Sequence, residues 1–202
     1  MSFKAPFYDY EYLRSRSQQF FETYNSRGLI PVPIELIIEK DFEIDIIPVP
    51  GLNEFDVVAY INRGMNEIHV DDYVYNNRTG RYRFSLAHEL GHRILHSEIW
   101  EQFCFDGILE WREFHQNAIP EREYDFLEYH ADCFAGLILV PSNSLQTAFL
   151  ECISLLRDRD HDIETISDVV RTIIEGHLAP IFEVSRAVIH KRLEKDKLWD
   201  SI

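Results

Sequence analysis

The chain is poor in cysteine, in cationic residues and in long apolar runs. Its three cysteines, Cys104, Cys133 and Cys152, are an odd number with no paired spacing. This excludes a disulfide scaffold and favours a reducing cytoplasmic location. Lysine and arginine number 20 against 35 aspartates and glutamates, which gives a net charge of -15. A general nucleic-acid binder needs a basic surface, so we expect no direct nucleic-acid binding, whereas a basic protein partner is compatible with this charge.

Apolar residues make up 46% of the 202 positions, but no run approaches the 18 that a membrane span requires. Residues 1–6 lack the apolar core of a secretory leader, so we expect neither a leader nor contact with a membrane. The length and the apolar content fit one compact domain, or one domain with a small appendage.

The pattern H-E-x-x-H, which is typical of zinc hydrolases, occurs at His88-Glu89-Leu90-Gly91-His92. On a helix, His88 and His92 lie about 40° apart and about 6 Å along the axis, so both imidazoles can reach one tetrahedral metal ion. Glu89 lies about 100° from His88. It is placed beside the open position of the metal, where it can take a proton from water.

The residues around the motif support a helix. Four apolar residues share the side opposite the two histidines and would anchor the helix in a core: Leu86, Ala87, Leu90 and Ile94. Ser85 is a candidate early capping residue, and residues 76–80 (N-N-R-T-G) are expected to form a polar loop that leads into the helix.

A second helix is predicted from Glu123 to Leu139, and Pro141 would end it. Glu128 and Asp132 lie one turn apart on the side opposite its main apolar face. Glu128 suits the third metal ligand, and Asp132 suits an acceptor for the second ring N–H of a ligating histidine. The alternative is a solvated carboxylate pair.

Two other histidines are less suitable as third ligands. On an unbroken helix His96 would lie about 12 Å beyond His88, too far for bonds near 2 Å to one ion. His130 points away from Glu128 into apolar residues, and a buried, hydrogen-bonded histidine is the better interpretation.

Residues 83–96 (R-F-S-L-A-H-E-L-G-H-R-I-L-H) and 128–141 (E-Y-H-A-D-C-F-A-G-L-I-L-V-P) together resemble the ImmA/IrrE metallopeptidases. That family pairs R-F-T-x-A-H-E-x-G-H-x-x-L-H with a later E-x-x-A-[DN]-x-F-A-x-x-L-L-M-P. The resemblance implies a zincin-like fold, Zn²⁺ held by His88, His92 and Glu128, and Glu89 as general base. It also implies a regulatory protease that acts on a DNA-binding repressor. Departures are Ser85 for threonine, I-L-V-P for L-L-M-P, and a longer interval between the two blocks.

The rest of the chain predicts an α+β fold with a small sheet. We expect helices over residues 9–27 and 34–40, a strand over 42–48, a hairpin with strands over 56–62 and 67–70, one short helix within 97–122, and helices beyond Pro141. We expect a zincin-like metallopeptidase domain over residues 1–145 and a helical C-terminal segment packed on it over 146–202.

Several further assignments depend on the site. In zincin-like enzymes an edge strand beside the active helix can hold an extended substrate, and the hairpin is the candidate for this role; plain sheet packing is the alternative. His115 or Tyr124 could stabilise the oxyanion of peptide hydrolysis, and the sequence does not choose between them. The aspartates at 158, 160 and 162 do not form an EF-hand, because isoleucine and valine stand at its required glycine and glutamate positions.

Residues 182–193 resemble the second half of a helix-turn-helix, but the tail from 181 to 202 carries five cationic residues against four acidic ones. That balance is too small for phosphate binding, so we interpret the tail as a packing or partner-docking element. The sequence therefore predicts a zinc metallopeptidase that cleaves a cytoplasmic regulator. The alternative is an anti-repressor binding protein that keeps the zinc-stabilised fold without proteolysis.

Overall fold

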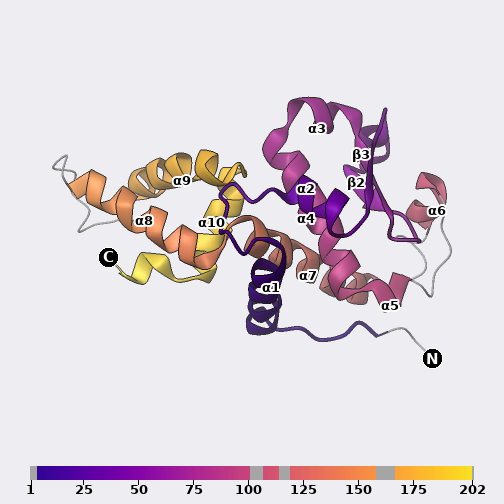
Figure 1. Ribbon diagram of the computed structural model, residues 1–202, viewed down its shortest axis with the longest axis horizontal. Helices are drawn as coiled ribbons and strands as arrows, with labels where there is room; N and C mark the ends of the chain where they lie inside the picture. Colours follow the sequence, from indigo (N-terminus) through magenta and orange to yellow (C-terminus); the bar gives the residue numbers. More distant parts are fainter. Residues whose placement is uncertain (1–3, 101–106, 114–118, 158–166, 202) are drawn as a thin grey trace.

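A small sheet lies at one end of the molecule and three C-terminal helices lie at the other, with long central helices between them (Figure 1). The computed structural model describes residues 4–100, 107–113, 119–157 and 167–201. Helices predominate over the three strands in these residues, and the expected α+β class is confirmed.

The sheet has three strands, β1 (Asp45–Val49), β2 (Ala59–Ile61) and β3 (Glu67–Asp71), in the order β1-β3-β2. β1 pairs with β3 in parallel, and β2 pairs with β3 antiparallel, with Tyr60 opposite His69. The predicted hairpin is therefore confirmed, and β2 is an edge strand. β1 begins three residues later than expected, because Glu43 has a φ of 53°, which a regular strand does not accommodate.

The N-terminal helices follow their predicted positions. α1 spans Tyr10–Tyr24 and is capped by the Asp9 side chain, which accepts a hydrogen bond from the Tyr12 N–H at 2.8 Å. α2 spans Ile34–Lys40, as expected. A short 3-10 helix, η1 (Leu52–Phe55), follows β1.

The predicted loop at residues 76–80 is wrong. α3 covers Asp72–Asn77 and α4 covers Thr79–Leu95, so Arg78 alone separates two helices. Asp71 caps α3 by accepting from the Val74 N–H, and the Asn76 and Asn77 side chains donate to carbonyls one turn back. These local bonds stabilise helix where the polar composition suggested a loop. Ser85 lies inside α4 and is not its cap.

Two short helices, α5 (Ser97–Trp100) and α6 (Ile108–Glu113), stand in the described part of the interval for which we expected one. α7 (Glu121–Leu139) begins directly after Pro120 and ends before Pro141, which cannot continue the helix. Together α4 and α7 form the most extensive helix contact in the described structure.

Beyond Pro141 the described residues are helical, as expected: α8 (Ser142–Arg157), α9 (Asp168–Phe182), α10 (Arg186–Lys195) and the 3-10 turn η3 (Leu198–Ser201). One buried apolar cluster contains residues from α1 through η3.

The division at residue 145 stays a prediction, and the aspartates at 158, 160 and 162 lie outside the described residues. No described helix is long and apolar enough to cross a bilayer alone. α7 and α8 together have the length and composition of a membrane span, but a bend of 60° separates them.

Candidate metal centre

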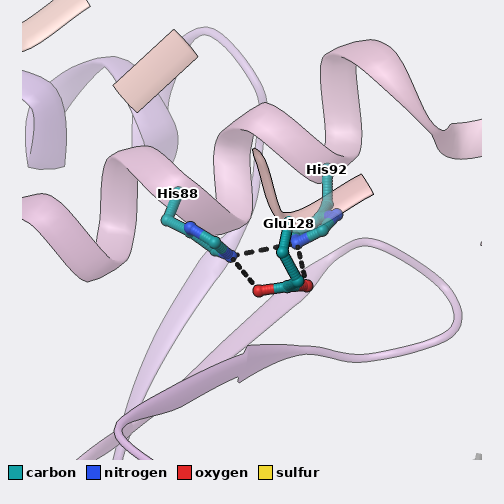
Figure 2. Close-up of side chains that lie close together, drawn as sticks. All are labelled: His88, His92 and Glu128. Carbon is teal, nitrogen blue, oxygen red and sulfur yellow. Dashed lines mark hydrogen bonds and ion pairs between the residues drawn. The ribbon is translucent and has the colours of Figure 1, made fainter. Parts of the chain in front are cut away.

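Three side chains from two helices converge at the centre of the molecule (Figure 2). His88 and His92 project from α4, and Glu128 projects from α7. The two imidazole Nε2 atoms lie 3.1 Å apart, and each lies 3.2 Å from one carboxylate oxygen of Glu128. The structure thus brings together the three residues that the sequence nominated as metal ligands.

A glycine allows the two helices to approach this closely. Gly91 lies on α4 between the two histidines of the site, and a Cβ added there would come within 3.2 Å of the Ala131 Cα on α7. Because Gly91 has no side chain, the backbones can cross near this point, and Glu128, one turn before Ala131, reaches the imidazoles. The glycine of H-E-L-G-H therefore has a packing role that is separate from metal chemistry.

The donor set fits a zinc ion. Tetrahedral bonds of about 2.0–2.1 Å would place the donor atoms roughly 3.3 Å apart, close to the 3.1–3.2 Å separations seen here. Two imidazole nitrogens and one carboxylate are also a typical protein ligand set of a catalytic zinc, which keeps its fourth position open. The three side chains could hold a metal ion without large rearrangement.

His88 is oriented from outside the cluster by Asp132, whose Oδ1 lies 3.0 Å from the His88 Nδ1. Asp132 is one turn beyond Glu128 on α7, the arrangement that the sequence suggested for a supporting carboxylate. Burial alone would lower the pKa of His88, but the Asp132 and Glu128 carboxylates raise it well above its usual value. The pKa of Glu128 is raised by burial and lowered more strongly by His88 and His92, so it lies far below its usual range. The site therefore attracts positive charge.

His92 is oriented by other histidines, a feature that the sequence reasoning missed. Its Nδ1 lies 3.0 Å from the His96 Nδ1, and the His96 Nε2 lies 3.4 Å from the His130 Nδ1. His130 in turn bonds the main chain of Tyr8. Burial, followed by the neighbouring His92, lowers the pKa of His96 to about 2, so His96 is neutral. If the His92 Nε2 faces a metal, its Nδ1 carries the proton and donates it to His96.

His96 takes this position because α4 ends at Leu95 and His96 is its C-cap. The distance argument that excluded His96 as a ligand assumed an unbroken helix, and it could not show that His96 turns back to support His92. The spacing of four residues between His92 and His96 was the signal in the sequence that could have indicated this contact. His130 is buried and hydrogen-bonded, as predicted.

Glu89 is buried beside the three converging residues. Its Oε2 accepts a hydrogen bond of 2.9 Å from the Ile61 N–H at the end of edge strand β2. Burial raises the pKa of Glu89, although His88 and His92 oppose that increase. A carboxylate with a raised pKa, fixed to a strand and facing a cleft, has the properties of a general base.

A cleft of about 360 Å³ opens over these groups. Its lining includes His88, Glu89 and Glu128, Val58 just before β2, Ala59 at the start of β2, and the aromatic side chains of Phe84, Trp100 and Tyr124. Burial and the Glu128 carboxylate raise the pKa of Tyr124, so its hydroxyl keeps its proton. His115, the other proposed oxyanion donor, lies outside the described residues.

The fold and the site define a class of protein: an α+β chain in which an H-E-x-x-H helix and a glutamate from a second helix form a candidate metal centre. The IrrE N-terminal-like domain of peptidase family M78 matches residues 41–194. This match covers most of the chain, including both helices of the centre. The chain therefore belongs to this family, as its resemblance to the ImmA/IrrE metallopeptidases implied, and the family supports a zincin-like core and a metallopeptidase in general. No curated protein matches the chain significantly.

Proposed function

We propose that this protein is a zinc-dependent metallopeptidase in which His88, His92 and Glu128 hold the ion. The observation that carries the proposal is the mutual spacing of 3.1–3.2 Å among the two Nε2 atoms and the Glu128 carboxylate, with Glu89 buried beside them. The family match supports the same chemistry independently of the geometry.

Glu89 is the general base of the proposed reaction. A bound zinc ion would lower the pKa of a water molecule towards about 7 and polarise the scissile carbonyl. Glu89 accepts a proton from the attacking water and transfers it to the leaving amine. The Ile61 N–H fixes one carboxylate oxygen and leaves the other for this proton.

Two further side chains support the reaction. Asp132 accepts the Nδ1–H of His88 and directs the other ring nitrogen towards the ion. Tyr124 lines the cleft with a protonated hydroxyl, which can donate to the oxyanion that forms on the substrate carbonyl.

The proposed substrate is a protein, and we infer a cytoplasmic repressor-type regulator. β2 is an edge strand. Its first residue, Ala59, and the preceding Val58 line the cleft, so an extended substrate segment can add to the sheet beside Glu89. The acidic charge of the chain favours a basic partner, which a DNA-binding protein would provide.

The test is Glu89→Gln. Glutamine can still accept the Ile61 N–H, so the fold and the metal content should be retained, while cleavage of a repressor encoded beside this chain should fall by about 10²–10⁴-fold. Metal analysis and a gel-based cleavage assay give the two readouts. Glu151→Gln, an exposed glutamate on α8, is the matched control and should cleave normally. Full activity in Glu89→Gln would refute the role.

The same variant tests the alternative function, an anti-repressor that acts by binding alone. A binding protein with Glu89→Gln would still relieve repression in a reporter assay, because its surface is unchanged. A protease with that substitution would not.

A further inference from the structure

A second and larger cavity, of about 710 Å³, is lined by residues of α4, α7 and α10. Phe84 of α4, Cys133 and Gly136 of α7, and Ala187 and Val188 of α10 contribute to its mostly apolar walls. It shares Arg81 and Phe84 with the cleft over the metal centre, but none of the three candidate ligands lines it.

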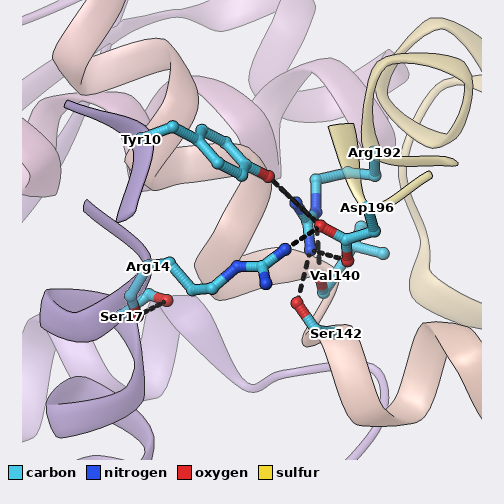
Figure 3. Close-up of polar contacts among 7 residues, drawn as sticks. All are labelled: Tyr10, Arg14, Ser17, Val140, Ser142, Arg192 and Asp196. Carbon is cyan, nitrogen blue, oxygen red and sulfur yellow. Dashed lines mark hydrogen bonds and ion pairs between the residues drawn. The ribbon is translucent and has the colours of Figure 1, made fainter. Parts of the chain in front are cut away.

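The wall formed by α10 is held in place by a buried polar cluster (Figure 3). Arg192, which lines the cavity, donates to Asp196 at 2.8 Å, to the Ser142 hydroxyl at 2.9 Å and to the Val140 carbonyl at 3.3 Å. It also donates to the Tyr10 hydroxyl. These bonds fix α10 to α1 and to the junction of α7 and α8, so the cavity is preformed.

Most charged groups around the cavity already have partners. Arg192 is paired with Asp196, Glu194 with Arg171, and Asp132 with His88. Lys195 donates to the Tyr129 hydroxyl at 3.3 Å.

Arg81 and Lys191 differ from these groups. Both line the cavity with exposed side chains, and the described residues offer neither of them an ion pair or a side-chain hydrogen bond. Cys133 lines the same cavity. Burial raises the pKa of its thiol, and the Tyr129 hydroxyl, Lys195 and Lys191 oppose this increase. On a chain of net charge -15, two unpaired cations beside an apolar cavity are complementary to an anion with an apolar body.

We propose that this cavity binds a small amphipathic anion, of the class of medium-chain alkyl or aryl carboxylates and sulfonates. The apolar body would lie between α7 and α10, and the anionic group would lie at Arg81 and Lys191. The volume of the cavity is within the range of small-molecule sites, and its surface is mostly apolar, as is typical of such sites. The proposal does not depend on the peptidase function, because it uses none of the metal ligands.

The first experiment measures binding of decanoate to the full chain by calorimetry, and its competition with 1-anilinonaphthalene-8-sulfonate by fluorescence. We expect one decanoate per chain with a dissociation constant in the micromolar range, and displacement of the dye. Decyltrimethylammonium, which has the same tail and the opposite charge, should bind at least about tenfold more weakly. Equal binding of the two amphiphiles would overturn the proposal, as would no binding of decanoate at millimolar concentration.

Substitutions then locate the site. Arg81→Glu/Lys191→Glu should weaken decanoate binding by at least about tenfold, because it reverses both charges at the cavity. Arg27→Glu/Lys40→Glu, which makes the same change at two exposed positions away from the cavity, should leave binding within about twofold of the original chain. Ala187→Trp should also weaken binding by filling the cavity, while Val169→Trp, on the exposed side of α9, should not.

Cys133 provides an independent readout inside the cavity. Decanoate should slow alkylation of Cys133 by N-ethylmaleimide, as mapped by peptide mass spectrometry, and should leave Cys152, which does not line the cavity, unchanged. If the charge-reversed and filled variants bind decanoate normally, or if Cys133 is not protected, the proposal is wrong. If only an amphipathic peptide protects Cys133, the cavity is a protein-docking groove and the proposal is also wrong.

Discussion

Two clusters of polar side chains, one around Arg192 and one at the metal centre, differ in how their members are satisfied. In the cluster around Arg192, guanidinium groups of Arg192 and Arg14 face the Asp196 carboxylate, and every nitrogen of Arg192 has an acceptor (Figure 3). In the metal centre, the Nε2 atoms of His88 and His92 and the Glu128 carboxylate lie 3.1–3.2 Å from one another (Figure 2).

The difference separates a structural cluster from a binding site. All three guanidinium nitrogens of Arg192 and both Asp196 carboxylate oxygens have partners within the cluster, so no bound ion is needed to satisfy them. The metal centre is different because Asp132 and His96 lie at the Nδ1 atoms of His88 and His92, so both Nε2 atoms face the Glu128 carboxylate, where a proton or a metal ion can lie between them. Such a group is stable only around a positive charge. Buried polar residues indicate a functional site when the protein alone does not supply partners for all of their hydrogen-bonding groups.

The largest expected effect is loss of the metal on removing one of its ligands. Glu128→Ala deletes the anionic donor and leaves two imidazoles, so purified protein should fall from about one zinc per chain to none, as measured by atomic emission after dialysis. Asp125→Ala, an exposed position on the same helix, should keep its metal. Stoichiometric zinc in Glu128→Ala would show that His88, His92 and Glu128 do not together form the zinc site.

The next largest effect is on stability, at the other cluster. Arg192→Met leaves Asp196 buried with only Arg14 as an ionic partner, and we expect the free energy of unfolding to fall by about 3 kcal/mol in urea denaturation. Zinc affinity of the folded variant should be unchanged, since the two clusters share no residue. Replacing both partners, Arg192→Met/Asp196→Leu, should recover much of the loss, because no uncompensated charge remains. A loss below about 1 kcal/mol in the single variant would mean that the cluster is not structural.

The two clusters also differ in how far the sequence could predict them. His88, His92 and Glu128 could be predicted because the spacing of residues on a helix determines the direction of each side chain, so two short motifs define the converging side chains. The role of His96 was not accessible, since it depends on α4 ending at Leu95 and on His130 lying behind it. The Arg192 cluster joins residues 182 positions apart, and no local pattern contains that information.

The same reasoning explains the errors in the fold. The helices α1, α2 and α7 and the hairpin have strong periodicity or clear stop residues. α2 was predicted to the residue, and the ends of α1, α7 and the hairpin strands were predicted to within three residues. Residues 76–80 were assigned to a loop on polar composition, but capping by Asp71 and side-chain bonds of Asn76 and Asn77 made them helical. The larger cavity arises where α10 packs against α7, a tertiary contact that periodicity does not encode.

A smaller effect should distinguish the two supports of the metal ligands. His96→Phe removes the neutral acceptor of the His92 Nδ1–H, and zinc affinity should fall by about 10–100-fold in a chelator competition assay. Asp132→Asn keeps an acceptor for His88 and loses only the charge, so its effect should lie at the low end of that range. Equal affinities in both variants and the original chain would show that neither residue orients a ligand.

The smallest effect is expected at an ion pair that has almost the same length as Arg192–Asp196. Arg171 and Glu194 lie 2.7 Å apart, against 2.8 Å for the buried pair, but their side chains are 33% and 49% exposed, against 4% and 5%. Solvent screens an exposed pair, so Glu194→Gln should change the free energy of unfolding by less than about 1 kcal/mol. The distances match, and the pairs differ in burial and in the further hydrogen bonds that Arg192 makes to Tyr10, Val140 and Ser142. If Glu194→Gln costs as much as Arg192→Met in the same urea titration, then burial does not explain why one cluster is structural and the other pair is incidental.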